Sequence, residues 1–363
     1  MPRTVSLSVR SKARAKPTPV GNDPAIFRRA LLHWYDHNQR DLPWRKTRNP
    51  YRIWLSEIML QQTRVAAVLD YYRKFLEKFP DLQTLAAASE DAVLASWSGL
   101  GYYRRARMLH QCAKHIVEQN DGRFPNTSKA LLALPGIGRY TAAAIASIAF
   151  AEPVAVVDGN VERVLQRLTG SHLATPQIWQ HAQQLLDPSR PGDFNQAMME
   201  LGATVCVPGE PQCLLCPVRK HCVTRGELPR AGQPSRQQKQ QIWCALDSRQ
   251  RDPKINGELR SNSNKNINVE VRLVQRSRET SLMPGMWELP QSFDPPQLSP
   301  KAAPWRTFRH SITVTDYTVH VLRGAQPWNA AAPTKARWIA ADRIPHLPIT
   351  GLTRKILRAG GII

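Results

Sequence analysis

The sequence predicts a multidomain protein in which an all-α part is followed by a smaller α+β part. Apolar residues recur at helical spacing from about residue 23 to residue 225. A polar, glutamine-rich stretch with two prolines then occupies residues 228–241, which we interpret as a linker. Beyond residue 268, apolar and polar residues alternate as they do in half-buried strands. The length of 363 residues suits two or three domains.

The charge of the chain favours a polyanionic partner. The formal net charge is +22 at pH 7 and the pI is about 10.3, so nucleic acid is the expected partner. Residues 1–22 hold five basic residues and no acidic one. We favour a flexible basic arm for this segment, although its composition also resembles a transit peptide.

Composition also excludes several classes of protein. A hydrophobic content of 42% excludes a wholly disordered chain. The longest nearly apolar run, residues 141–151, has about half of the ~20 residues that a membrane span needs. The N-terminus lacks the apolar core of a secretory signal. We therefore expect a soluble protein without a membrane partner.

The helical part begins near Asp23, where Leu31, Leu32, Trp34 and Tyr35 open one apolar face. Short breaks of Gly, Pro and Asn separate the segments that follow. Segments with helical spacing are residues 54–69, 84–97, 104–119, 127–134, 139–150, 161–169 and 193–205. They predict one all-helical unit or two helical lobes over residues 23–227.

The part after the linker is expected to form a smaller α/β or β-rich domain over residues 242–363. Val269, Val271 and Leu273 alternate with polar residues, and Ile312, Val314 and residues 317–321 do so in part. Residues 252–268 are polar and are expected to form a long loop within this domain.

Four of the six cysteines are concentrated in one short segment. Cys206, Cys213, Cys216 and Cys222 have the spacing C-x6-C-x2-C-x5-C. Disulfides are disfavoured without a secretory signal, and structural zinc sites usually pair two C-x2-C units. Four thiolates this close together favour a [4Fe–4S] cluster. Cys112 and Cys244 are expected to be ordinary buried thiols.

Residues 134–141 read L-P-G-I-G-R-Y-T between two predicted helices. Gly136 and Gly138 allow a tight hairpin whose backbone N–H groups lie at the start of the next helix, where anions bind well. A plain interhelical turn is the alternative, because such connections are common. Arg139 next to the glycines favours phosphate binding.

Two carboxylates have surroundings that suit acid–base chemistry. Glu57 lies among apolar residues, where we expect its pKa to be raised, although a surface position on an amphipathic helix is the simpler alternative. Asp158 follows the apolar run 154–157 and precedes a helix, so it is expected to be an N-cap held ionised by the helix dipole. One protonated and one ionised carboxyl can break a glycosidic bond, but the sequence does not bring the two together.

The chain resembles the adenine DNA glycosylases of the MutY type, within the helix–hairpin–helix DNA glycosylases, densely over residues 24–225. The motifs follow the family's order: L-P-W-R (42–45), W-L-S-E-I-M-L-Q-Q-T-R-V (54–65), G-L-G-Y-Y-R-R-A-R (99–107), L-P-G-I-G-R-Y-T-A (134–142), V-D-G-N-V-E-R-V (157–164), F-N-Q-A-M-M-E-L-G-A (194–203) and the four-cysteine loop. Bifunctional relatives such as endonuclease III carry a lysine nucleophile in the hairpin, where this chain has Tyr140. The resemblance therefore implies a monofunctional glycosylase.

The resemblance also implies roles for individual residues. Glu57 would protonate the adenine, Asp158 would stabilise the cationic sugar, and Tyr140 would assist beside them. The flipped adenine would be lined by Trp44, Arg45 and Gln196, although core packing is the simpler reading of Trp44. Gln62 and Tyr102 would wedge into the duplex, although Tyr102 could also be a plain helix-terminal aromatic.

The C-terminal part resembles the family more loosely. L-M-P-G-M-W-E-L-P-Q (282–291) is similar to the Nudix-type domain that reads 8-oxoguanine, and no glutamate-rich metal-binding helix is visible. The family's Phe-Ser-His hairpin would correspond to Phe308, Arg309 and His310, followed by Ser311. Either Ser311 takes over the serine's role or the lesion contact differs. The implied partner is double-stranded DNA with A opposite 8-oxoguanine or G, bound by a monomer in the bacterial cytoplasm at the nucleoid.

Overall fold

The computed structural model describes residues 23–228, 238–250, 269–280, 282–295, 303–312, 315–324 and 336–363. Its contacts divide the chain into two compact units. Unit 1 comprises Met1–Asp41 and Ala142–Gly232, and unit 2 comprises Leu42–Thr141 and Gln233–Ile363. The predicted helical domain is therefore divided into two lobes, and the boundary falls within helix α8 (Arg139–Phe150). The predicted arm at residues 1–22 lies outside the described residues.

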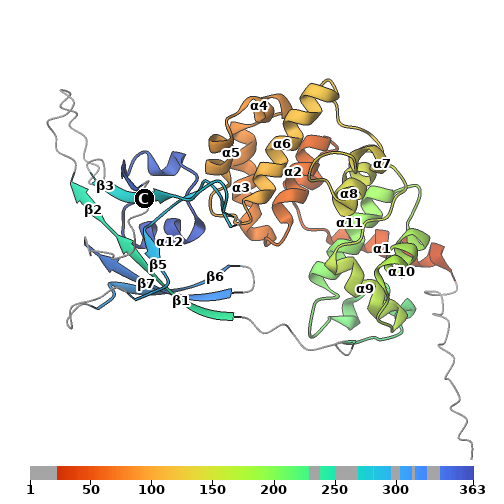
Figure 1. Cartoon of the computed structure of the whole chain (residues 1–363). Coiled ribbons are helices and arrows are strands. Elements are labelled where there is room, and N and C mark those ends of the chain that lie inside the picture. The colour runs from red at the N-terminus through yellow and green to blue at the C-terminus, as the bar shows by residue number, and fades with distance from the viewer. Residues whose placement is uncertain are drawn as a thin grey trace, which may run out of the picture. The chain divides into compact units, whose positions relative to one another are not determined.

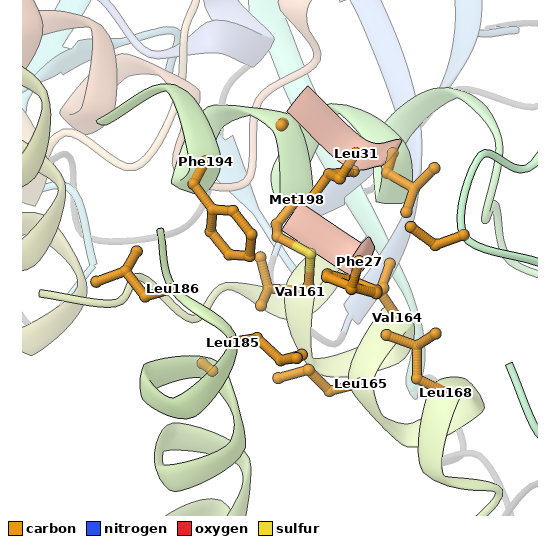
Figure 2. Packing of buried hydrophobic residues seen from close by; sticks show 14 of the residues in the cluster. Phe27, Leu31, Val161, Val164, Leu165, Leu168, Leu185, Leu186, Phe194 and Met198 are labelled. Carbon is orange, nitrogen blue, oxygen red and sulfur yellow. The ribbon is translucent and has the colours of Figure 1, made fainter. Parts of the chain in front are cut away.

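Within the described residues, unit 1 holds most of α8 together with α1 (Pro24–Asn38), α9 (Gly159–Thr169), α10 (Thr175–Leu185) and α11 (Pro191–Thr204) (Figure 1). Helices α10 and α11 each pack against both α1 and α9. Figure 2 shows the core that they share, to which Phe27 and Leu31 of α1 and Val161, Val164 and Leu165 of α9 belong. Two short turns, η2 (Cys213–Leu215) and η3 (Arg219–His221), follow in the cysteine loop.

Unit 2 contains the remaining helices of the predicted helical part. They are η1 (Pro43–Arg45), α2 (Pro50–Leu60), α3 (Val65–Lys78), α4 (Leu82–Ala87), α5 (Glu90–Trp97), α6 (Arg104–Gln119), α7 (Ser128–Leu131) and the start of α8. The predictions over 104–119 and 139–150 are confirmed residue for residue. The prediction of single helices over 54–69 and 84–97 is wrong. The first is split where Gln62 adopts a left-handed backbone with φ of 56°, and the second where Ser89 caps α5.

The C-terminal part of unit 2 is an α+β arrangement of two four-stranded sheets. One sheet has the order β5-β1-β7-β6, with β1 and β7 parallel; in the other, β3 pairs with β2, β4 and β8. Helix α12 (Gly351–Ala359) contributes Leu352, Ile356 and Leu357 to the core that the strands share. The strands are β1 (Gln238–Leu246), β2 (Ser248–Gln250), β3 (Val269–Gln275), β4 (Trp287–Glu288), β5 (Gln291–Ser292), β6 (Arg306–Ile312), β7 (Thr315–Arg323) and β8 (Ala336–Ala340).

The predicted linker ends earlier than expected. Residues 238–241 belong to strand β1, where they pair in parallel with the start of β7. Their polar side chains are exposed, and exposed polar residues do not prevent backbone pairing. The polar residues 252–268 and Val314 lie outside the described residues.

Among the helices of the described ranges, none is both long and apolar enough to cross a membrane.

Candidate active site

Glu57 lies on helix α2, which is buried on nearly all sides between Tyr51 and Met59. The Glu57 residue is only 6% exposed, so the alternative of a surface glutamate is wrong. The hydroxyl of Tyr140, at the start of α8, donates to Glu57 Oε2 at 2.5 Å. A buried carboxyl needs such a partner, because burial without a hydrogen bond is costly. The structure thus brings together the predicted acid and the tyrosine that occupies the lysine position.

The hairpin between α7 and α8 is present as predicted. The N–H of Ile137 donates to the carbonyl of Leu134 at 3.2 Å and closes the turn. Gly136 has φ of +74°, and a Cβ there would lie 2.8 Å from Met108 Cβ, so this position requires glycine. A Cβ on Gly138 would meet nothing within 4 Å. Packing within the protein therefore does not require glycine at position 138.

Gln62 and Tyr102 share two unusual features. Both are exposed, Tyr102 by 48%, and both are non-glycine residues with positive φ, 56° and 49°. Gln62 follows α2, and Tyr102 precedes α6. A left-handed non-glycine residue costs about 1–3 kcal/mol and persists where surrounding contacts impose it. The two residues expected to form the wedge therefore combine a strained backbone with an exposed side chain.

Arg105 follows Tyr102 on helix α6, and its guanidinium is directed into the protein. There it donates to carbonyls of the segments that carry Gln62 and Tyr102. Burial lowers its pKa to about 10, so it remains a cation at neutral pH. Nothing in the hydropathy pattern separated Arg105 from its exposed neighbour Arg104.

Trp44 and Arg45 were expected to line an adenine pocket. Trp44 is 6% exposed, and its ring packs edge-on against Tyr72 at 5.3 Å between centroids. Trp44 therefore packs in the core, and its contact with adenine stays a prediction. Arg45 is half-buried in the same turn.

Asp158 lies in unit 1, as does the half-buried Gln196 of α11. The predicted N-cap is confirmed, because Asp158 Oδ1 accepts from the N–H of Val161 at 2.8 Å. Its other oxygen, Oδ2, accepts from Asn160 Nδ2 at 2.8 Å. Asp158 therefore satisfies one of the N–H groups at the start of α9 that lack an intrahelical partner.

Two residues that sequence reasoning missed support the chain on either side of Asp158. The Asn195 side chain accepts from the N–H of Val156 at 3.0 Å and donates to the carbonyl of Val154 at 2.9 Å. Gly202 of α11 faces the start of α9, and a Cβ there would lie 2.6 Å from Asn160 Cβ. Both fall within the 194–203 motif, which was the available signal.

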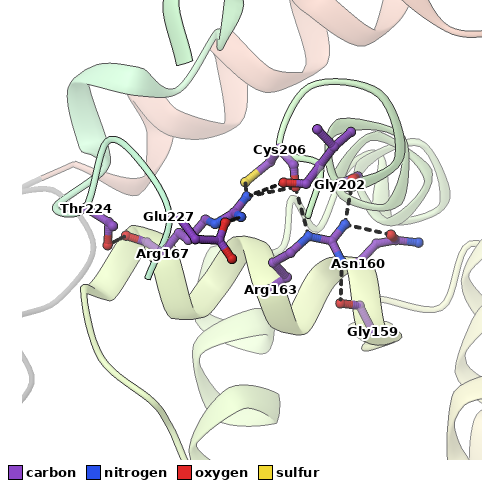
Figure 3. Close-up of polar contacts among 9 residues, drawn as sticks. Gly159, Asn160, Arg163, Arg167, Gly202, Cys206, Thr224 and Glu227 are labelled. Carbon is purple, nitrogen blue, oxygen red and sulfur yellow. Dashed lines mark hydrogen bonds and ion pairs between the residues drawn. The ribbon is translucent and has the colours of Figure 1, made fainter. Parts of the chain in front are cut away.

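Arg163 and Arg167 connect helix α9 to the cysteine loop. Figure 3 shows the Arg163 guanidinium turned toward Gly202 and Cys206, and the Arg167 guanidinium turned toward Cys206. Arg163 Nε donates to the carbonyl of Cys206 at 2.9 Å. Arg167 Nη1 donates to Cys206 Sγ at 3.2 Å, and its Nη2 is paired with Glu227. The arginines therefore order the first thiol of the loop.

The four predicted cluster cysteines line one pocket. The pocket is partly open to solvent, and apolar residues such as Val164, Leu201 and Val218 also line it. In the described ranges, no three His, Cys, Asp or Glu side chains converge on one metal-ion position. Thiols spread around a pocket suit a group larger than a single ion, so the arrangement is compatible with an iron–sulfur cofactor. Burial raises the pKa of Cys216 to about 11.

Strand β6 carries the residues expected to read the opposite base. Alternation along the strand places half-buried Phe308 and His310 on one face and exposed Arg309 and Ser311 on the other. The Ser311 hydroxyl donates to Asp316 Oδ1 on β7 at 2.5 Å. Burial lowers the pKa of His310, with a smaller effect from Lys355.

Comparison with known proteins places these features in a family. Residues 55–188 match the model described as HhH-GPD superfamily base excision DNA repair protein. A solved structure titled as a thermostable thymine-DNA glycosylase is 32% identical, with a TM-score of 0.53, and the match covers 56% of this chain and 96% of that one.

Curated proteins named adenine DNA glycosylase are more similar in sequence. The Mus musculus protein is 50% identical over 249 residues, which cover 63% of this chain and 47% of that protein. The Homo sapiens protein is 52% identical over 214 residues, covering 55% and 39%. The Buchnera aphidicola subsp. Baizongia pistaciae protein is 40% identical over 202 residues, covering 54% and 58%. The chain thus spans about half the length of the curated relatives it matches.

Proposed function

Because the chain belongs to the HhH-GPD superfamily of base excision DNA repair proteins, we propose that it excises adenine from duplex DNA by hydrolysing the N-glycosidic bond. The observation that carries the proposal is the buried Glu57 carboxyl hydrogen-bonded to Tyr140 in the hairpin motif. The names of the curated relatives support adenine as the base.

In the proposed reaction, Glu57 donates a proton to the adenine ring and makes the base a better leaving group. Asp158, an N-cap carboxylate, stabilises the positive charge that develops on the sugar. Tyr140 orients Glu57 through its hydroxyl. A tyrosine offers no amine to attack the sugar, so the proposed enzyme is monofunctional.

The base must leave the stack before this chemistry. We assign the wedge to Gln62 and Tyr102, whose exposed side chains can occupy the space left in the duplex. The proposed contacts of the flipped adenine are Trp44, Arg45 and Gln196. The Trp44 ring is held in place by its packing against Tyr72.

The partner in this proposal is double-stranded DNA with A opposite 8-oxoguanine or G, bound by a monomer. Gly136 and Gly138 bring the hairpin backbone close to a phosphate, and the bare surface at Gly138 leaves room for it. The net charge of +22 supports phosphate binding. A bacterial, nucleoid-associated location in the cytoplasm belongs to the same proposal.

We further propose that Cys206, Cys213, Cys216 and Cys222 hold a [4Fe–4S] cluster in their shared pocket. Such a cluster supplies four metal–thiolate bonds that would fix the loop. The chain's own contribution is the ordering of Cys206 by Arg167 and of Cys222, whose sulfur accepts from the N–H of Arg225 at 3.3 Å.

Residues 242–363 are the proposed Nudix-like reader of 8-oxoguanine. Phe308, His310 and Ser311 were assigned to lesion reading from the resemblance, and the two faces of β6 divide this set. Because the Ser311 hydroxyl already donates to Asp316, exposed Arg309 is the freer side chain on that face. A contact through Arg309 is therefore our preferred alternative to the usual serine contact.

Single-turnover excision on three matched duplexes tests the proposed function. The duplexes carry A opposite 8-oxoguanine, A opposite G, and T opposite G. We expect release of adenine from the first two, fastest with 8-oxoguanine, and little covalent adduct with borohydride. No adenine release by protein with an intact loop would reject the proposal. Efficient release of thymine would instead indicate a thymine-mismatch glycosylase, a second candidate function that the similarity to a thymine-DNA glycosylase supports.

A further inference from the structure

A single guanidinium connects the two loops that carry Gln62 and Tyr102. Arg105 Nη1 donates to the carbonyls of Ile58, Met59 and Gln61 at 2.7, 2.9 and 2.6 Å. Arg105 Nη2 donates to Thr63 Oγ1 at 3.2 Å and to the carbonyls of Leu100 and Gly101 at 3.3 Å each. One side chain thus contacts residues on both sides of Gln62 and the two residues before Tyr102.

The carbonyls at the end of α2 are well suited to a cationic donor. Ile58 and Met59 belong to the last turn of α2, where carbonyls lack intrahelical partners and the helix dipole is negative. The carbonyl of Gln61 belongs to the residue just before the left-handed Gln62. An arginine at this point satisfies the helix end and fixes the reversed backbone that follows it.

The aromatic contacts act on the second loop. The guanidinium carbon of Arg105 lies 5.4 Å from the ring centroids of both Trp97 and Tyr102. Trp97 is fully buried, whereas Tyr102 is exposed, so Arg105 links the wedge ring to the core of α5. Cation–π contacts of this kind hold the ring in place beside the guanidinium.

We propose that Arg105 is a positioning residue that holds Gln62 and Tyr102 in the geometry needed to open the duplex. This inference rests on the proposed function, because it assigns Arg105 a role in base flipping rather than in chemistry. The planar fork of arginine is required, since it offers several donors in fixed directions, whereas lysine offers a compact point charge on a flexible stem.

Two duplexes separate flipping from chemistry. Both carry A opposite 8-oxoguanine; in the second, the residues on either side of the adenine are abasic, so the adenine has no stacking partners to lose. Arg105→Met and Arg105→Lys are compared with wild type by single-turnover adenine release. Arg104→Met is the matched control, because it removes the same charge from the exposed neighbouring position. Thermal melting checks that each variant is folded.

We expect Arg105→Met to lose at least about 10-fold on the stacked duplex and less than about 3-fold on the abasic-flanked one, a difference that a flipping role requires. Arg105→Lys should show the same pattern more weakly and, because it keeps the charge, remain testable if the methionine variant fails to fold. Arg104→Met should change both duplexes equally. Equal losses on both duplexes for the Arg105 variants, or no loss, would overturn the inference. If wild-type protein releases no adenine from either duplex, the proposed function fails instead.

Discussion

At the scale of single residues, the proposed catalytic carboxylates also have local structural duties. Asp158 caps helix α9, and Glu57 accepts a hydrogen bond from Tyr140 inside the protein. The capping role of Asp158 and its proposed chemical role are compatible, because the cap hydrogen bond fixes the position of the carboxylate. A local structural explanation of a residue therefore does not argue against its part in a reaction.

Asp158→Asn separates these two roles. Asparagine is as good an N-cap as aspartate, so the fold and the duplex affinity should be nearly unchanged. Loss of the negative charge should slow adenine excision by at least about 10²-fold, the usual cost of removing one electrostatic stabiliser. Single-turnover rates and duplex titrations measure both. A large loss of affinity would point to a positioning role for Asp158.

Arg309→Ser tests the reading of the lesion. Arg309 is exposed on β6, and the substitution restores the serine that the family pattern has at this position. We expect the ratio of excision rates opposite 8-oxoguanine and opposite G to change more than overall duplex affinity does. An unchanged ratio would exclude the Arg309 side chain from lesion reading.

The sequence predicted functional residues where the residue type and spacing are themselves informative. It missed residues whose role depends on what surrounds them in the folded chain. The cysteine spacing predicted four thiols that the structure places around one pocket. Arg105 could not be told apart from Arg104, because the two are adjacent, identical in charge and differ only in what surrounds them. Gly202 and Asn195 were within a quoted motif, but their packing against the start of α9 and the segment before Asp158 depends on long-range folding.

At the scale of elements, periodicity predicted helices better than their interruptions. Helices α6 and α8 match the predicted bounds because their apolar residues keep helical spacing without interruption. The split between α2 and α3 depends on the left-handed backbone of Gln62. A glutamine in the sequence does not predict that conformation. Helix α10 was not predicted, although Ile178, Ala182 and Leu185 have helical spacing and are buried.

The close approach of α11 to α9 gives a prediction at this scale. In most helices Gly→Ala stabilises by up to about 1 kcal/mol. In Gly202→Ala the new methyl group would meet Asn160, so we expect a loss of about 1–3 kcal/mol and slower excision. Gly351→Ala at the start of α12 is the control, because its Cβ meets nothing within 4 Å. Urea unfolding compares the two; equal effects would mean that α9 moves away without cost.

At the scale of the whole molecule, the folding units differ from the domains that composition suggests. The helical part is divided between the two units, and residues 42–141 group with the C-terminal sheets. Contacts such as Tyr103 OH to the carbonyl of Ile349 at 3.0 Å join the parts of unit 2. Composition reports where polar linkers lie and not which distant segments pack together, so this grouping could not be predicted.

Stability should depend on pH through His110, which is buried on α6. Burial, helped by the nearby charge of Lys114, lowers its pKa below the ordinary value of about 6.5. The unfolded chain therefore binds more protons below pH 6.5, so this residue makes the fold less stable as pH falls through that value. Urea midpoints at pH 5.5 and 7.5 should differ less in His110→Gln than in wild type, with His115→Gln as control. An identical pH dependence in wild type and His110→Gln would contradict this assignment.

The central claim, that the Glu57 carboxyl protonates adenine for excision, is tested most directly by chromatography of free adenine. Wild-type protein and Glu57→Gln are each mixed in excess with a duplex carrying A opposite 8-oxoguanine. We expect one adenine per duplex from wild type, and a rate lower by about 10²–10⁴-fold from Glu57→Gln at equal duplex binding. Adenine release by Glu57→Gln at the wild-type rate would contradict the account.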